Sequence, residues 1–148
     1  YNIIPSFFIA HIYYWGDTHI KNFGLERASK ISTAKSCLEK EIKFTFHQDS
    51  PVIEPNMFET IWCAVKRKTK KGILLGKEEQ ISVSEAIKAV TINAAYQYFE
   101  ENTKGSIKEG KFANLIIVNK NPLKVKIDEI KDIEILETIK EGTVIYKN

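Results

Sequence analysis

Cysteine and histidine are scarce in this sequence, which has 2 cysteines and 3 histidines among 148 residues. Cys37 and Cys63 lack the CxxC spacing of a zinc knuckle, and one pair is too few for a disulfide scaffold. Both cysteines fall in segments of helical composition. We therefore expect two buried free thiols, with neither a structural zinc site nor a disulfide framework.

Long apolar runs and a strong charge of one sign are also missing. No apolar stretch approaches the roughly 20 residues of a membrane span, and no signal peptide is seen, so we expect no membrane partner and favour the cytoplasm. The formal net charge is only +3. The one dense basic cluster, residues 66–71, is interpreted as a solvated helix end, because cations suit a helix C-terminus. No nucleic-acid partner is expected.

The chain does have the composition of a globular domain, with 43% hydrophobic and 28% charged residues. Up to about residue 102, β-type and helical patterns alternate. The β-type segments are residues 5–15, apolar on both faces, and 42–46; the helical segments are 32–41, 55–69 and 82–102, the last opened by a capping box of Ser82 and Glu85. A loop with a short helix is expected over 16–31. This alternation predicts a parallel α/β unit.

The pattern changes after residue 102. Short β-type runs follow at residues 114–119, 132–142 and 143–148. Pro122 and Gly142 separate these runs, which predicts a small antiparallel ladder that ends in a hairpin near Gly142. The chain therefore divides into an α/β part, residues 1–102, and an all-β part, residues 103–148.

Polar side chains follow directly on the β-type segment 42–46. Strand alternation places one polar set on a common face: Lys43, Thr45, His47 and Asp49. In a closed (β/α) barrel this face would project inward at the C-terminal mouth, where such barrels keep their active sites. His11 lies near the C-terminal end of its own predicted strand in the same way.

Imidazole and carboxylate groups at strand ends supply the nitrogen and oxygen ligands that suit zinc and similar divalent ions. This makes His11, His47 and Asp49 candidates for metal or acid–base chemistry. Spacing alone favours a structural role at this point, because a lone histidine on an apolar strand is more often a hydrogen-bonded core residue and His-x-Asp is a short pattern. His19 lies in the predicted polar loop and is expected at the surface.

Three blocks of the sequence carry a family resemblance. They are PSFFIAHIYYWGDTH with LERASKIS, FTFHQDSPVIEP with AVKRKTKKGILLG, and SVSEAIKAVTINAAYQYFEENTKGSIKEGKFANLIIVNKNPL. The chain resembles metal-dependent amidohydrolases of the third amidohydrolase family, the YtcJ-like or exoenzyme-regulator-like group. The resemblance implies the C-terminal part of a (β/α)8 TIM-type barrel, about strands six to eight with their helices, over residues 1–102. Strands of a small β-sandwich would follow over residues 103–148.

The resemblance also implies residue roles. His11 would be the metal-ligand histidine at the end of barrel strand six. Asp49 would be the strand-eight aspartate that binds metal and takes the proton of the attacking water, and His47 would hold substrate or orient Asp49. The implied reaction is hydrolysis of a C–N bond in a small-molecule amide or cyclic amide by water activated on a divalent metal, with zinc expected.

The ligand set of the family is incomplete in this sequence. Its His-x-His pair has no counterpart, because the only histidines are His11, His19 and His47. A (β/α)8 barrel takes roughly 250 residues. We therefore expect part of a longer enzyme that is inactive as this segment alone; the alternative is a non-catalytic binding or regulatory module on the same scaffold. An exposed edge of the first strand would also allow pairing with a second copy.

Overall fold

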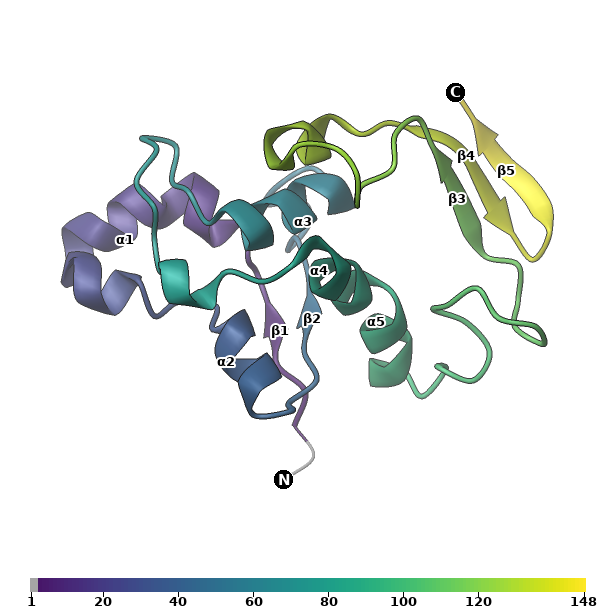
Figure 1. Ribbon diagram of the computed structural model, residues 1–148, viewed down its shortest axis with the longest axis horizontal. Helices are drawn as coiled ribbons and strands as arrows, with labels where there is room; N and C mark the ends of the chain where they lie inside the picture. The colour runs from purple at the N-terminus through teal and green to yellow at the C-terminus, as the bar shows by residue number, and fades with distance from the viewer. Residues whose placement is uncertain (1–2) are drawn as a thin grey trace.

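A computed structural model describes residues 3–148; Tyr1 and Asn2, the first residues of the predicted barrel part, lie outside the described residues. Helices surround a two-stranded parallel sheet, and a three-stranded antiparallel sheet stands at the end of the molecule opposite α1 (Figure 1). The first part contains β1 (Ser6–Phe7), α1 (His11–Ala28), α2 (Ala34–Glu39), β2 (Thr45–Phe46), α3 (Met57–Lys66), the 3-10 helix η1 (Lys77–Glu79), α4 (Val83–Val90) and α5 (Ile92–Gln97). None of the helices within residues 3–148 could cross a bilayer.

Residues 5–15 do not form the long strand that the sequence predicted. β1 covers Ser6–Phe7 only, and α1 begins at His11. Ile9 and Ile12 are fully buried. A short apolar run fits a buried helix as well as a buried strand, so the pattern alone does not separate the two.

The segment expected as a loop, residues 16–31, is mostly helix. α1 continues through it to Ala28, and the only break is at Gly24, where φ is 76° and ψ is 160°. That left-handed φ is open to glycine without a side-chain penalty. Residues 11–28 therefore form one long helix with a kink at Gly24.

β1 and β2 pair directly in parallel, with Ser6 opposite Thr45 and Phe7 opposite Phe46. α1 and α2 form the crossover that parallel strands require. The sequence predicted about three parallel strands, whereas the described residues contain two. If β2 is the eighth barrel strand, as the resemblance implies, its neighbour β1 is the seventh. On that numbering His11 would follow the seventh strand, one strand later than the resemblance alone implies.

The helices after β2 begin as the sequence predicts but are shorter. The Asn56 side chain caps α3 by accepting from the N–H groups of Phe58 (3.0 Å) and Glu59 (3.1 Å). The long helix expected over residues 82–102 is divided into α4 and α5 at Thr91, where φ is −127° and ψ is −93°. Both predicted thiols are buried and free.

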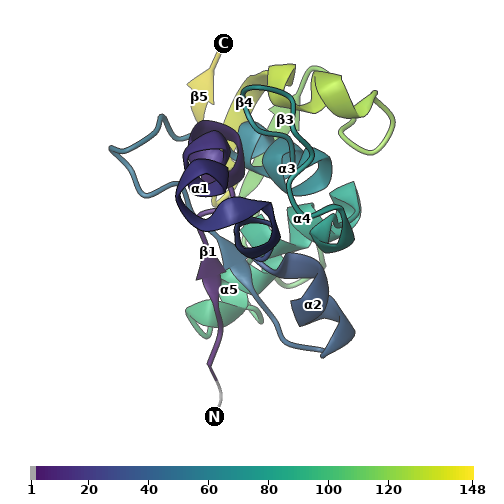
Figure 2. The same ribbon diagram turned by 90° about the vertical axis from the view of Figure 1, so that its left-hand side faces the viewer.

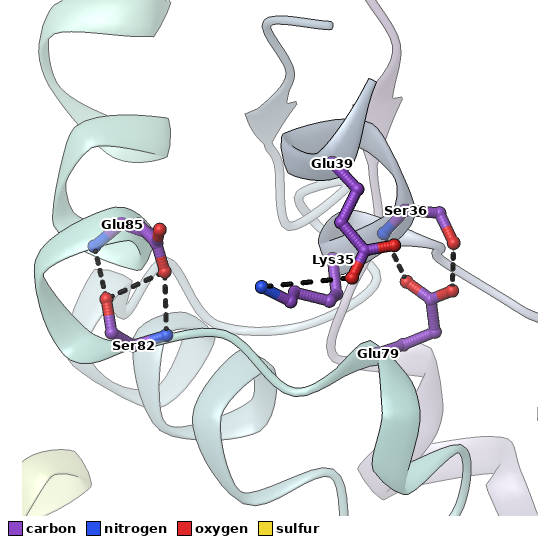
Figure 3. Close-up of polar contacts among 6 residues, drawn as sticks. All are labelled: Lys35, Ser36, Glu39, Glu79, Ser82 and Glu85. Atoms are coloured by element: carbon purple, nitrogen blue, oxygen red, sulfur yellow. Dashed lines mark hydrogen bonds and ion pairs between the residues drawn. The ribbon is translucent and has the colours of Figure 1, made fainter. Parts of the chain in front are cut away.

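The predicted capping box at α4 is confirmed (Figure 3). Glu85 N–H donates to the Ser82 hydroxyl (3.2 Å), and Ser82 N–H donates to the Glu85 carboxylate (3.0 Å). Figure 3 also shows a carboxylate that caps α2 from another element: Glu79 of η1 accepts from the N–H of Ser36 (2.9 Å) and from its hydroxyl. These contacts fix the start of two helices that flank the parallel strands.

The basic cluster at residues 66–71 was predicted to be a solvated helix end, and this is wrong at Arg67. α3 stops at Lys66, and Arg67 is fully buried in a left-handed conformation, with φ 48° and ψ 43°. Its guanidinium donates to the carbonyl oxygens of three residues: Leu75 (3.0 Å), Ser32 (3.0 Å) and Ile31 (2.9 Å). The chain folds back on itself here, and residues 67–76 form a strap over α1. Burial lowers the pKa of Arg67 to about 10, so the charge persists at neutral pH.

The all-β part matches the sequence patterns closely. β3 (Leu115–Val118), β4 (Ile135–Lys140) and β5 (Thr143–Lys147) pair antiparallel in that order, with the predicted hairpin at Gly142. The 3-10 helix η2 (Ile127–Asp132) was not predicted. It buries Ile130 against the core, and Asp128 accepts from Lys66 of α3 (2.8 Å). This contact joins the connection before β4 to the helical body.

Candidate active site

The parallel pairing of β1 with β2 brings two candidate residues to one edge of the sheet. His47 N–H donates to the carbonyl oxygen of Phe7 (3.1 Å), which aligns the ends of the two strands. The ring of Phe8 then lies 4.4 Å from that of His11 and 5.4 Å from that of His47, measured between centroids. The two imidazoles predicted from sequence thus flank one phenyl ring.

Asp49 lies in the loop after β2 and is exposed. Figure 2 shows this loop reaching outward from the body on the side of α1. Asp49 has a left-handed φ of 51°, and its carbonyl accepts from Val52 N–H (2.8 Å). Non-glycine residues in this region are held there at a cost and are concentrated at functional sites.

The surroundings of His11 lower its pKa below the ordinary value of 6.5, which favours the neutral imidazole. Burial lowers its pKa most, and the neighbouring His19 and His47 lower it further. The charge of Asp49 acts in the opposite direction. A neutral imidazole has the free lone pair that a metal ligand needs.

His19, which the sequence predicts at the surface, is half-buried and lies beside His11. Its ring lies 5.5 Å from that of His11, and its Nε2 is buried with no hydrogen-bond partner within residues 3–148. The predicted loop is helix, and residues eight apart in a helix share a face. The His-x7-His spacing was the signal that could have placed it at the site.

The predicted inward polar face of β2 is wrong at Thr45. This residue is buried, and its hydroxyl donates to the Gln97 side chain of α5 (2.8 Å). Gln48 is also buried and donates to the Asn56 carbonyl at the start of α3 (2.6 Å). The polar residues beside His47 therefore anchor the strand and its loop to the surrounding helices.

The residues of this chain form at most part of a metal centre. Within residues 3–148, no three His, Cys, Asp or Glu side chains converge in a group that could hold a metal ion. A neutral imidazole and an exposed carboxylate are suitable ligands for a divalent cation. Two ligands are, however, fewer than the three protein ligands of a catalytic zinc site.

Two large cavities lie elsewhere. Two openings of about 740 and 760 Å³ lie between the antiparallel sheet and α4, and both are lined by Ile87, Val90 and Ile116. Neither contains a histidine or an aspartate. We therefore locate the candidate site from His11, His47 and Asp49 and not from the size of these cavities.

Comparison with known proteins decides the family. The model of the amidohydrolase family matches residues 2–146. The chain belongs to the amidohydrolase family. This confirms the resemblance seen in the sequence blocks.

Three relatives illustrate the similarity of this amidohydrolase chain. It is 29% identical over 118 residues to the N-substituted formamide deformylase of Arthrobacter pascens, covering 80% of this chain and 22% of that protein. It is 26% identical over 143 residues to YtcJ of Bacillus subtilis (strain 168), named as an amidohydrolase, covering 95% and 26%. An uncharacterized metal-dependent hydrolase from Pyrococcus horikoshii OT3 has a TM-score of 0.71 and 24% identity, covering 86% and 26%.

The amidohydrolase chain spans about a quarter of the length of these relatives, between 22% and 26%. Its α/β fold agrees with that of the hydrolase structure. The matched family and YtcJ are both amidohydrolases by name, so membership in a hydrolase family is established for this chain.

Proposed function

We propose that this chain is the C-terminal part of a metal-dependent amidohydrolase that hydrolyses a C–N bond in a small-molecule amide or cyclic amide. One observation carries the proposal. In a chain of the amidohydrolase family, the paired ends of β1 and β2 bring His11 and His47 to one edge, and Asp49 is close enough to oppose the lowered pKa of His11. The name of one relative, N-substituted formamide deformylase, belongs to the same reaction class.

The strand–helix–strand unit supports a place in a (β/α)8 barrel. β1, α1, α2 and β2 form the repeating unit of such a barrel, with adjacent parallel strands. Barrel enzymes build their sites from residues that follow the C-terminal ends of the strands. His11 and Asp49 both follow strands at that end, and the antiparallel strands β3, β4 and β5 would then belong to a β-sandwich beside the barrel.

His11 and Asp49 are the proposed metal ligands. The neutral imidazole offers a nitrogen and the exposed carboxylate an oxygen, a pair that zinc accepts. A divalent metal bound there would lower the pKa of a water molecule to about 7. Two protein ligands are one or more short of the three that catalytic zinc sites use, so the remaining ligands would come from outside these residues.

Asp49 is the proposed general base. It would take the proton of the attacking water and return it to the leaving nitrogen, which makes nitrogen a better leaving group. The hydrogen bond from Val52 N–H to the Asp49 carbonyl fixes the backbone and leaves the carboxylate exposed for this exchange. His47, on the same short loop, would hold substrate or orient Asp49.

The natural polypeptide that carries this chain provides the test. It is assayed for amine release from N-substituted formamides, acetamides and cyclic amides before chelation, after chelation and after zinc is restored. Hydrolysis that disappears on chelation and returns with zinc is expected, whereas residues 1–148 alone should be inactive. Hydrolysis that is indifferent to chelation would contradict the metal. Amide binding without any turnover would favour the binding-module alternative.

A further inference from the structure

Gln48 lies between His47 and Asp49 in the sequence, and its environment differs from that of both neighbours. The Gln48 side chain is only 4% exposed, whereas His47 is half-buried and Asp49 is exposed. Its Nε2 atom donates to the backbone carbonyl oxygen of Asn56 at 2.6 Å. The residue next to the proposed general base is therefore bonded directly to the start of α3.

The bond from Gln48 to Asn56 closes the base of the loop that carries Asp49. We call residues 49–55 the Asp49 loop; it extends outward from the body of the molecule and returns at α3 (Figure 2). On the β2 side, His47 N–H donates to β1 (3.1 Å). On the α3 side, the Asn56 side chain accepts from two N–H groups of the first helical turn. The Gln48 amide ties these two fixed ends to each other.

The contacts inside the Asp49 loop are local. Val52 N–H donates to the Asp49 carbonyl (2.8 Å), and the Ser50 hydroxyl donates to the Ile53 carbonyl (3.4 Å). Ile53 is the only buried residue of the range 49–55, all of which the structure describes. The position of Asp49 is therefore set mainly at the base of the loop, where Gln48 lies.

Gln48 is not the side chain that stability alone would favour at this position. Its Oε1 atom is buried and has no hydrogen-bond partner within residues 3–148. An unpaired buried acceptor costs free energy that an apolar side chain of the same length would avoid. The opposite amide orientation would set Oε1 against the Asn56 carbonyl, acceptor against acceptor. The Thr60 hydroxyl also donates to that carbonyl (3.3 Å), so the carbonyl would keep a partner without Gln48.

We propose that Gln48 is a positioning residue of the reaction, whose amide closes the Asp49 loop and holds the Asp49 carboxylate in place at the end of β2. Gln48 would act through this loop and not on the substrate. The inference rests on the proposed function, in which Asp49 is a ligand and the general base. Displacement of a reacting group by about 1 Å can lower a rate by about 10²-fold. A bond at the base of the loop therefore matters more for the reaction than for stability.

Gln48→Met tests the proposal, because methionine has a similar length and donates no hydrogen bond. In the natural polypeptide that carries this chain, the melting temperature should stay the same or rise, since the unpaired Oε1 is removed as well. Amide hydrogen exchange in residues 49–55, followed by mass spectrometry, should become about tenfold faster, which corresponds to about 1.4 kcal/mol. Exchange in the rest of the polypeptide should match the parent.

Zinc binding and kinetics of Gln48→Met report on the carboxylate itself. Zinc affinity, measured by competition with a chelating dye, should weaken about tenfold, because residues that orient a ligand contribute on this scale. The kcat for amide hydrolysis should fall by about 10- to 100-fold with KM within about twofold, since the loop positions Asp49 and not the substrate.

Thr60→Val is the matched control, because it removes the other donor to the Asn56 carbonyl and conserves the shape of a fully buried side chain. It should keep the exchange in residues 49–55, the zinc affinity and the kcat of the parent.

Three outcomes for Gln48→Met would overturn the proposal: unchanged exchange in residues 49–55, faster exchange with unchanged zinc affinity and kcat, or a marked fall in melting temperature, which would show a structural role. The proposed function can fail separately. Faster exchange and weaker zinc binding in a polypeptide whose parent releases no amine from any amide would support the positioning role of Gln48 and count against amide hydrolysis.

Discussion

His47 donates its backbone N–H to the carbonyl oxygen of Phe7 at 3.1 Å, and this bond closes the parallel pair at its C-terminal end. Beyond it the two chains separate, one into α1 and the other into the loop of Asp49. The side chains at the point of separation are those that the family resemblance identified. Variants at these positions therefore test the proposed chemistry more directly than variants in the strands themselves.

Replacement of Asp49 by asparagine should abolish most catalysis and leave the fold in place. Loss of a general base lowers kcat by about 10²–10⁴-fold, and loss of a ligand adds to this effect. The side chain is exposed, so its replacement should leave the melting temperature nearly unchanged. Steady-state kinetics of the natural polypeptide measure the effect, and Glu54→Gln, an exposed carboxylate in the same loop, is the control. Near-normal turnover in Asp49→Asn would remove the assignment.

Replacement of His11 by alanine should reduce bound metal. His11 is one of the two proposed ligands in this chain, so its loss should lower the metal content of the purified polypeptide well below that of the parent. Elemental analysis after gel filtration provides the measurement. His47→Ala is the comparison and should retain metal, because His47 is not among the proposed ligands. Equal metal in both variants would exclude His11 from the ligand set.

The sequence predicted the sheet in the all-β part better than the segment before the site. β3, β4 and β5 alternate with turn residues at short intervals, so local pattern and final structure agree. Residues 5–15 gave the wrong element because an apolar run has no period that separates buried strand from buried helix. The position of His19 followed from that error, since a loop offers no fixed face.

Arg67 shows a second limit of sequence reasoning. A run of basic residues normally indicates a solvated surface, yet Arg67 is buried by chain segments that lie far from it in the sequence. Its three carbonyl acceptors come from Ile31, Ser32 and Leu75. Such partners are set by tertiary packing, which no local pattern encodes. The capping box of Ser82 and Glu85 was predictable because both partners lie within one helical turn.

Substitution of Gly76 by alanine should destabilise the fold far more than the same change at Gly110. Both glycines have a left-handed φ, 71° and 85°, so both substitutions carry the backbone penalty of about 1–2 kcal/mol. Only at Gly76 would the new Cβ overlap the Ser29 carbonyl oxygen, and it would also lie 2.9 Å from Nη2 of Arg67. Urea unfolding compares the two variants. Equal unfolding midpoints for the two variants would show that the strap accommodates the added methyl group without losing stability.

Ser82→Ala should cost about 1 kcal/mol at neutral pH, because it removes the side-chain half of the capping box. The hydrogen bonds from Ser82 hold the pKa of Glu85 below its ordinary value of 4.5. A lowered folded-state pKa gives stability that is present above the unfolded value and lost as pH falls through the folded one. The difference between parent and variant should therefore shrink on acidification below about pH 4.5. Thermal melts at pH 7 and pH 3 measure it, with Ser84→Ala as the control on the same helix. A difference that stays constant with pH would show that Glu85 does not depend on the Ser82 hydroxyl.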